Sequence, residues 1–179
     1  MNIVLFFTYE VSLQNWKETG LFEREIRIYN EMISRHGVSI TFLTYGDKRD
    51  RNLESKIKNI KVIPIYEKIY RPKNKIIRFI KSLFIPLYFK NELKNCDIYK
   101  TNQMWGSWLA LISKFLYKKP FIVRCGWEKY FNRLQGFGQT NKYATWLVSK
   151  VSYFFADEII LSSIHLVNFV CFAQTLFTK

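Results

Sequence analysis

Three loops of this 179-residue sequence carry residue types that could bind an anion or a sugar. Each loop follows a run of apolar residues that we expect to form a buried strand. The loops span residues 10–20 (EVSLQNWKETG), 100–108 (KTNQMWGSW) and 124–130 (RCGWEKY). Because ligands of parallel α/β sheets bind beyond the carboxyl ends of the strands, we expect the three loops to lie around one binding site.

The first loop ends at Gly20, directly before a segment with helical spacing of its apolar residues. Free backbone N–H groups and the helix dipole favour an anion such as phosphate at this position. The glycine could equally serve only to start the helix, so both interpretations stay open. Gly20 is therefore a candidate acceptor- or phosphate-binding residue.

The second loop offers two amides and a tryptophan. Asn102 and Gln103 follow a predicted buried strand, where their side chains could bind a ligand or tie neighbouring loops together. Trp105 and Trp108 flank Gly106, and we expect one of the two to belong to the core. Trp105 could instead stack on the apolar face of a sugar ring. We count Asn102, Gln103 and Trp105 among the candidate acceptor-binding residues.

The third loop begins with a charge at the end of a predicted buried strand. Such a charge needs a partner, and for Arg124 this could be Glu128 or a phosphate of the ligand. The candidate acceptor- or phosphate-binding residues of this loop are Arg124, Gly126 and Glu128. The sequence designates no catalytic residue.

Alternating strands and helices must position these loops. Buried strands are predicted at residues 3–8, 38–44, 60–65, 97–101, 120–124 and 158–161, and helices at residues 22–36, 107–116 and 144–155. This alternation implies a parallel sheet with right-handed crossovers. The predicted fold class is α/β, a single domain with a Rossmann-like parallel sheet flanked by helices.

The formal net charge of +14 favours an anionic partner, which could be nucleic acid, an acidic membrane face or a phosphorylated ligand. No helix-turn-helix, zinc-finger or RNP-type pattern is present, which argues against nucleic acid. The charge is concentrated between positions 68 and 94, where eight Lys or Arg residues stand against a single acid, Glu92.

A helix that begins at Lys75 is predicted within this basic segment, with Pro86 bending or ending it. Lys75, Arg78 and Lys81 gather on one side of the helical wheel, and the other side is apolar, with Ile76, Ile80, Leu83, Phe84 and Leu87. Such a helix could lie on an anionic membrane, at about 1 kcal/mol per basic residue. It could equally pack on the core with a solvated basic side.

The cysteines and the apolar runs limit which class of protein this sequence can belong to. Cys96, Cys125 and Cys171 form no C-x-x-C pair, so we predict neither a disulfide framework nor a metal site. No run reaches the roughly 18 apolar residues of a membrane span. The opening MNIVLFFTY is typical of a strand rather than of a signal peptide. We expect a cytoplasmic protein, with a peripheral position on the inner face of the membrane as the alternative that the basic helix raises.

Six segments follow one another along the chain as MNIVLFF, WKETGLFERE, VSITFLTYGD, DIYKTNQMWGSW, KKPFIVRCGWE and ADEIILSS. Their order resembles the N-terminal, acceptor-side domain of the family-four GT-B glycosyltransferases, over nearly the whole chain to about residue 169. The resemblance implies transfer of a sugar from a nucleotide sugar to an acceptor, usually with retention and without a metal. In this family the acceptor often belongs to a cell-surface polysaccharide or a lipid-linked glycan.

The sequence also departs from that family. The family's C-terminal Rossmann-like domain, which holds the donor with a basic pair and a glutamate-x7-glutamate motif, has no counterpart here. We expect residues 1–166 to be the acceptor-side domain and residues 167–179 an atypical apolar tail, as in a truncated or frameshifted product. The chain alone would then need no cofactor and be inactive, and a nucleotide-sugar donor would bind only together with a separate donor-domain subunit.

Three hypotheses for function follow from the sequence. The first is the acceptor-binding half of a glycosyltransferase, acting on a cell-surface glycan or a lipid-linked acceptor. The second is a non-catalytic scaffold subunit that pairs with another transferase. The third, a basic nucleic-acid-binding module, rests on charge alone.

Overall fold

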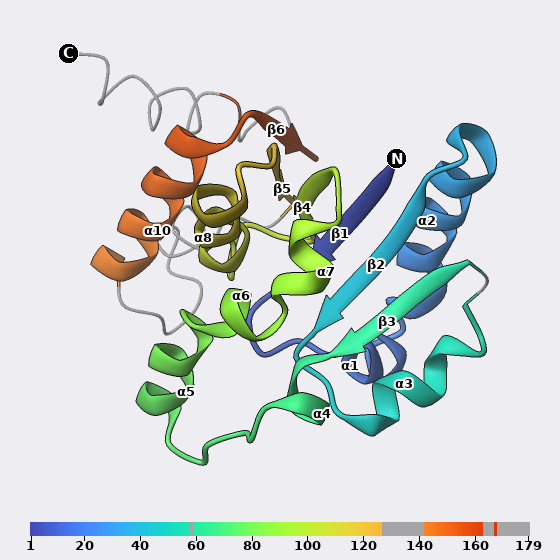
Figure 1. Cartoon of the computed structure of the whole chain (residues 1–179), viewed down its shortest axis with the longest axis horizontal. Coiled ribbons are helices and arrows are strands. Elements are labelled where there is room, and N and C mark those ends of the chain that lie inside the picture. The colour runs from blue at the N-terminus through green and yellow to red at the C-terminus, as the bar shows by residue number, and fades with distance from the viewer. Residues whose placement is uncertain (58, 127–141, 163–166, 168–179) are drawn as a thin grey trace.

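The computed structural model describes residues 1–57, 59–126, 142–162 and 167. Its sheet has six parallel strands in the order β3-β2-β1-β4-β5-β6 (Figure 1). The strands are β1 (Asn2–Phe6), β2 (Ser39–Thr44), β3 (Ile60–Pro64), β4 (Ile98–Thr101), β5 (Phe121–Cys125) and β6 (Glu158–Leu161). The strand that comes first in the sequence, β1, therefore lies in the interior of the sheet.

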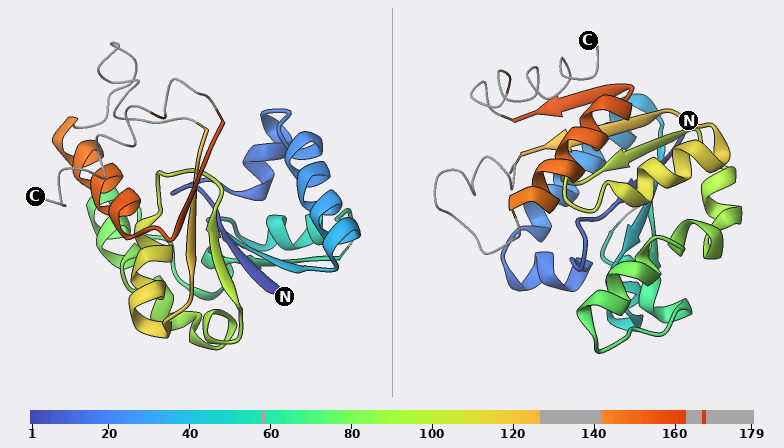
Figure 2. Two further views of the ribbon diagram at one scale, coloured as in Figure 1. Left: turned by 90° about the horizontal axis from the view of Figure 1, so that it is seen from above. Right: turned by 90° about the vertical axis from the view of Figure 1, so that its left-hand side faces the viewer.

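Helices cover both faces of the sheet (Figure 2). Those of the described residues are α1 (Leu13–Glu18), α2 (Phe22–His36), α3 (Lys48–Glu54), α4 (Ile65–Lys68), α5 (Lys75–Ser82), α6 (Ile85–Tyr88), α7 (Lys90–Lys94), α8 (Trp108–Tyr117) and α10 (Lys142–Phe155). Figure 1 shows α2 and α3 on one side of the molecule and α5, α8 and α10 on the other.

Successive strand residues point to opposite faces, so the strands feed two separate cores. Leu5 and Phe42 pack with α1, α2 and α3 in one core. Phe6 and Tyr99 pack with α6, α7, α8 and α10 in the other. All four side chains are at most 1% exposed. The near-continuous apolar runs of the sequence thus reflect strands that are buried on both faces.

The structure confirms the predicted α/β class, with its parallel sheet and flanking helices. The six predicted strands and three predicted long helices all have counterparts. The sequence analysis predicts neither α1, which lies within the loop of residues 10–20, nor α3, which follows the predicted strand at residues 38–44. Side-chain caps explain these short helices, since the Ser12 hydroxyl accepts from the Asn15 N–H and the Asp47 carboxylate accepts from the Arg49 N–H.

The predicted basic helix is present as α5, but one of its residues faces the other way. The sequence places Arg78 with Lys75 and Lys81 on the solvent side. In the structure Lys75 and Lys81 are exposed, whereas the Arg78 side chain is only 16% exposed and lies 3.5 Å from the Glu10 carboxylate. The charge of Arg78 is thus paired with Glu10 in the protein, and a contact of Arg78 with a membrane surface stays a prediction.

Membrane spanning can be judged from helix length and hydropathy. Among the described residues, no helix is both long and apolar enough to cross a bilayer.

Candidate functional site

The strand order reverses between β1 and β4, and the loops after these strands lie against each other at the carboxyl edge of the sheet. The Tyr9 N–H donates to the Trp105 carbonyl at 3.1 Å. Gly106 has a φ of +104°, and a Cβ there would lie 2.6 Å from the Tyr9 nitrogen. Only glycine allows this approach of the two loops.

Aromatic rings fill the space around this contact. The Tyr9 ring lies 5.1 Å from Trp108 and 5.2 Å from Tyr45. Trp105 meets Trp108 edge-on at 5.3 Å, and Phe79 of α5 meets the same ring at 5.4 Å. Trp108 is buried, which confirms that one of the two tryptophans belongs to the core. Trp105 is half-buried in the same cluster, and sugar stacking on its ring stays a prediction.

A buried ion pair stands at the end of β5. Arg124 donates from Nη1 to the Glu25 carboxylate of α2 at 2.7 Å and to the Asn102 amide oxygen at 3.4 Å. Arg24 binds the other oxygen of Glu25 at 2.8 Å. Burial pushes the pKa of Glu25 upward, but the hydrogen bonds from Arg124 and Arg24 outweigh it and lower the pKa overall. Glu25 is therefore a carboxylate at neutral pH, although its side chain is only 4% exposed.

Lys100 of β4 extends this cluster into the core on the α2 side. Lys100 is only 8% exposed. Its ammonium group lies 3.4 Å from the Tyr29 hydroxyl and 5.3 Å from the centre of the Tyr29 ring. Burial, followed by the charge of Arg124, lowers the pKa of Lys100, the charge of Glu25 raises it, and the net result is a pKa of about 8. The protein thus holds a cation inside at neutral pH, at a cost to its stability.

Replacing this lysine tests that cost. We expect Lys100→Met to raise the free energy of unfolding by about 2 kcal/mol at pH 7. The fall of the Lys100 pKa from 10.5 to about 8 corresponds to a destabilisation of about 3 kcal/mol at ~1.4 kcal/mol per unit, which the substitution removes. The substitution also loses the contact with Tyr29, which reduces the gain by about 1 kcal/mol. Between about pH 8 and pH 10.5 the unfolded chain binds more protons than the folded protein does. The stability of the wild type therefore rises with pH in this range, and the stability gain from Lys100→Met shrinks.

Urea denaturation at pH 7 and pH 10 measures both effects. Lys61→Met is the matched control, since Lys61 is an exposed lysine in β3 and we expect no comparable gain. A gain for Lys100→Met that is absent at pH 7, or that stays unchanged at pH 10, contradicts the described environment of Lys100.

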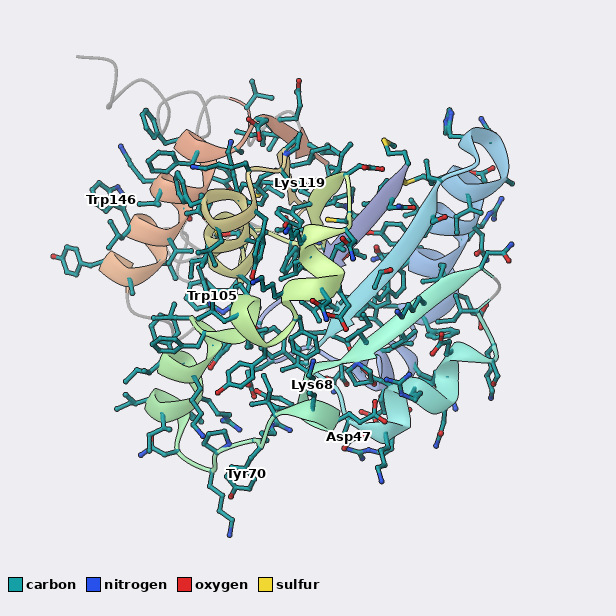
Figure 3. The ribbon with its side chains drawn as sticks, in the orientation of Figure 1. Asp47, Lys68, Tyr70, Trp105, Lys119 and Trp146 are labelled. Atoms are coloured by element: carbon teal, nitrogen blue, oxygen red, sulfur yellow. The ribbon has the colours of Figure 1, made fainter. Side chains whose placement is uncertain are left out.

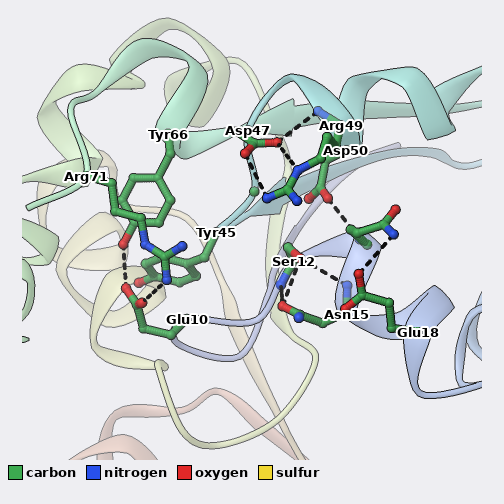
Figure 4. Close-up of a pocket in the computed structure, with 12 residues that line it drawn as sticks. Glu10, Ser12, Asn15, Glu18, Tyr45, Asp47, Arg49, Asp50, Tyr66 and Arg71 are labelled. Carbon is green, nitrogen blue, oxygen red and sulfur yellow. Dashed lines mark hydrogen bonds and ion pairs between the residues drawn. The ribbon is translucent and has the colours of Figure 1, made fainter. Parts of the chain in front are cut away.

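Glu10 connects the loop after β1 to Tyr66 of α4 and to Arg71 (Figure 4), and it also lies beside Arg78 of α5. It is one of few non-glycine residues with a positive φ, +63°. Its carboxylate accepts a hydrogen bond from the Tyr66 hydroxyl, binds Arg71 at 2.7 Å and lies 3.5 Å from Arg78. One carboxylate therefore fixes three separate segments at this edge of the sheet.

Gln103 and Gly126 lie together, as expected for neighbouring loops. The Gln103 side-chain oxygen accepts from the Gly126 N–H at 2.9 Å, which ties the loop after β4 to the loop after β5. Asn102 joins the same edge through its contact with Arg124. The structure thus brings Asn102, Gln103, Arg124 and Gly126 together, and ligand binding by them stays a prediction.

Two other predicted site residues stand apart from this group. Gly20 has a φ of +71° in the turn between α1 and α2, and it lines a separate hollow of about 180 Å³ with Lys17 and Lys56. Glu128, the protein partner proposed for Arg124, lies outside the described residues. Within the described part of the chain, the carboxylate that binds Arg124 belongs to Glu25.

Sequence reasoning missed Glu25 and Lys100, although both leave a signal. Glu25 stands on the apolar side of α2, between Phe22 and Tyr29, where an acid is unusual. Lys100 interrupts an otherwise buried strand in the same way. A charged residue at a core position of one element indicates a charge of opposite sign on a neighbouring element.

The comparisons with known proteins are sparse. No protein-family model matches the sequence, and no curated protein matches it. Among solved structures, the chain is similar to the crystal structure of MurG from Acinetobacter baumannii, with 14% sequence identity and a TM-score of 0.48. The match covers 90% of this chain and 45% of the MurG chain, so the protein spans less than half the length of that structure.

Proposed function

We propose that this chain is the acceptor-binding half of a glycosyltransferase that acts on a lipid-linked or cell-surface glycan at an anionic membrane. The ordered sequence segments that resemble family-four GT-B enzymes support this proposal, as does a parallel sheet with its loops gathered at a switch point. The observation that carries the membrane part is an exposed apolar surface directly beside those loops.

This α5–α6 apolar surface consists of Ile76, Ile77, Phe79, Ile80, Phe84, Leu87 and Tyr88. Each of these side chains is between 40% and 70% exposed. Large apolar side chains that gather in this way on a protein surface mark a binding site for a protein or a membrane. Much of the apolar side of α5 thus faces outward, although Phe79 and Leu83 also contact the core.

Charge and aromatic residues favour a membrane as the occupant. Lys75 and Lys81 are exposed on the same helix, where they can meet anionic headgroups. α10 lies on the same side of the molecule as α5 in both Figure 1 and Figure 2. It presents Tyr143 at 78% and Trp146 at 39% exposure, and Trp146 points away from the body of the protein (Figure 3). Such amphipathic rings suit the interface between lipid and water.

The surface is coupled to the loops at the carboxyl edge. The Trp108 indole donates to the Ser82 hydroxyl at 3.0 Å, Phe79 packs on the same indole, and Arg78 lies beside Glu10. A sugar on a membrane lipid would therefore meet the loops after β1 and β4. In our proposal a second, donor-binding domain faces this edge and orients the acceptor hydroxyl toward the sugar to be transferred.

Co-sedimentation with vesicles tests the proposal. We expect the protein to bind anionic vesicles of phosphatidylglycerol at low salt, less at high salt, and more tightly when the vesicles carry a polyprenyl-diphosphate-linked glycan. Ile80→Glu should weaken vesicle binding about tenfold or more, because it removes about 1 kcal/mol of apolar burial from a half-exposed side chain and adds a repelled charge worth about 1 kcal/mol.

Ile28→Glu is the matched control, since Ile28 is 41% exposed on α2, away from this surface. If both variants lose vesicle binding equally, or if the wild type does not bind anionic vesicles, the membrane part of the proposed function is contradicted. Equal binding with and without the glycan removes the acceptor part. Transfer from a nucleotide sugar by the chain alone at about 1 s⁻¹ or faster contradicts the assignment as half an enzyme.

A further inference from the structure

A polar cavity of about 350 Å³ lies beside the switch point, beyond the carboxyl end of β2 (Figure 4). Its walls come from the loop after β1, from α1, from the loop after β2, from α3 and from α4. The volume is at the lower end of the ~300–1,000 Å³ found for small-molecule sites. None of the residues predicted from the sequence as acceptor-binding lines it.

The floor of this cavity is firmly built. The Asp50 carboxylate is 1% exposed and accepts from the N–H groups of Leu13 and Gln14 and from the Thr44 hydroxyl, at 2.6–2.9 Å. A Cβ at Gly46 would lie 2.0 Å from the same carboxylate. The start of α1 and the end of β2 are therefore held together at the floor of the cavity.

The charges in the cavity disfavour an anionic ligand. Four acids and two arginines line it, in a chain that is otherwise strongly basic. Arg49 is bound by Asp47 at 3.0 Å, and Arg71 is bound by Glu10 at 2.7 Å. Because each arginine already has a carboxylate partner, neither offers a phosphate an unbalanced positive charge. The cavity therefore offers a phosphorylated ligand or a uronate no net positive charge.

The remaining lining groups suit a ligand with many hydroxyls. Glu18 receives a hydrogen bond from the Gln14 amide at 3.0 Å and keeps further acceptor capacity. The Arg49 guanidinium is 72% exposed and can still donate. Tyr45 also belongs to the wall, and its hydroxyl is fully buried with no hydrogen-bond partner among the described residues. Planar donors and acceptors at short spacing match the vicinal hydroxyls of a sugar.

We propose that this cavity binds one neutral sugar unit through Glu18, Gln14 and Arg49. The proposal deepens the proposed function and rests on it for one point, that this sugar is part of the acceptor. The sugar occupies the side of the switch point formed by β1 and β2, and the group around Arg124 lies on the side formed by β4 and β5.

Titration followed by amide chemical shifts tests this site. The probes are the methyl glycosides of glucose, galactose, mannose and N-acetylglucosamine, with glucose 6-phosphate, glucuronate and inorganic phosphate as anionic counterparts. We expect millimolar binding of at least one neutral glycoside, with the largest shifts at the amides of Gln14, Gly46 and Asp47. Glu18→Gln and Arg49→Gln should each weaken that binding by about tenfold.

Glu31→Gln is the matched control, because Glu31 is an exposed helical glutamate that pairs with an arginine on α2. Both Glu18 and Arg49 are exposed, so their variants should fold normally. The proposal is overturned if no neutral glycoside binds at tens of millimolar, as a rough upper limit for a single sugar, if the anionic probes bind more tightly, or if the shifts gather elsewhere.

The outcome separates this site from the proposed function. Glycoside binding that depends on Glu18, in a protein that ignores glycan-bearing vesicles, supports the cavity and removes the acceptor role. Vesicle binding that responds to the glycan but is unchanged in Glu18→Gln supports the acceptor role and overturns the cavity proposal.

Discussion

Glutamine in place of Glu25 is expected to lower the free energy of unfolding by about 3 kcal/mol at pH 7. The substitution preserves the shape of the side chain and removes the negative charge that Arg124 binds at 2.7 Å. Arg124 and Lys100 are then left as two partly or fully buried cations without a counter-charge. Breaking a buried pair from one side typically costs ~3–5 kcal/mol, and the glutamine amide recovers part of it.

A double-mutant cycle isolates this pair. We expect the double variant Glu25→Gln/Arg124→Met to lose less stability than the sum of the losses of the two single variants, by roughly 1–3 kcal/mol. Glu31→Gln serves as the surface control, since its pair with Arg35 is 57–70% exposed and should be worth under about 1 kcal/mol. Additive effects in the cycle would falsify the direct pairing of Glu25 with Arg124.

The same variant has a defined pH dependence. The pKa of Glu25 is lower in the folded protein than its ordinary 4.5, so its stabilising contribution is present above that value and is lost as the pH falls through the folded pKa. The difference in urea stability between wild type and Glu25→Gln should therefore be full at pH 7 and shrink below pH 4.5. A difference that stays constant down to acid unfolding contradicts an ionised Glu25.

The second large effect is expected at Asp50. Asp50→Ala should lower the free energy of unfolding by about 4 kcal/mol, because three donors lose their acceptor and the Leu13 N–H is buried. Asp50→Asn, which keeps one acceptor oxygen, should lose about half as much. Asp47→Ala, at a more exposed aspartate that caps α3, should cost about 1 kcal/mol.

Gly46 provides a stricter version of this experiment. A methyl group at Gly46 would overlap the Asp50 carboxylate, so Gly46→Ala should destabilise the protein although it adds only one carbon. In the Asp50→Ala background the same substitution meets no carboxylate and should cost little. Thermal and urea unfolding of the single and double variants measure this. Fully additive losses would show that Gly46 and Asp50 act independently and would contradict the described packing.

Whether a segment forms a helix or a strand was predictable where the spacing of its apolar residues fits only one of the two. Residues 38–44 and 120–124 could be predicted as strands because they are short, mostly apolar runs, and residues 22–36 as a helix because their apolar residues have helical spacing and Gly37 ends them in the left-handed conformation. The short helices were not predictable in this way. Residues 13–18 become helical because Ser12 caps them and the carboxylate of Asp50, 37 residues from Leu13, accepts from their first N–H groups.

The meeting of the loops was predictable, but the pairings of their side chains were not. The loops after β1, β4 and β5 do meet at one edge, as the rule for parallel sheets requires. Which carboxylate binds Arg124 depends on how α2 lies across the sheet, and Glu25 is 99 residues away in sequence. Arg78 shows the same limit, since a helical wheel gives its angular position but not the position of Glu10.

The interior position of β1 has a consequence for synthesis on the ribosome. The first 68 residues hold β1, β2, β3 and most of the core beneath α1, α2 and α3. That unit can assemble early, but the other edge of β1 stays open until residues 98–101 emerge to form β4. At ~5–20 residues per second this interval lasts on the order of several seconds. A nascent chain therefore displays an apolar strand edge during that time, and chaperones that cover such edges should matter more for its yield than for its final stability.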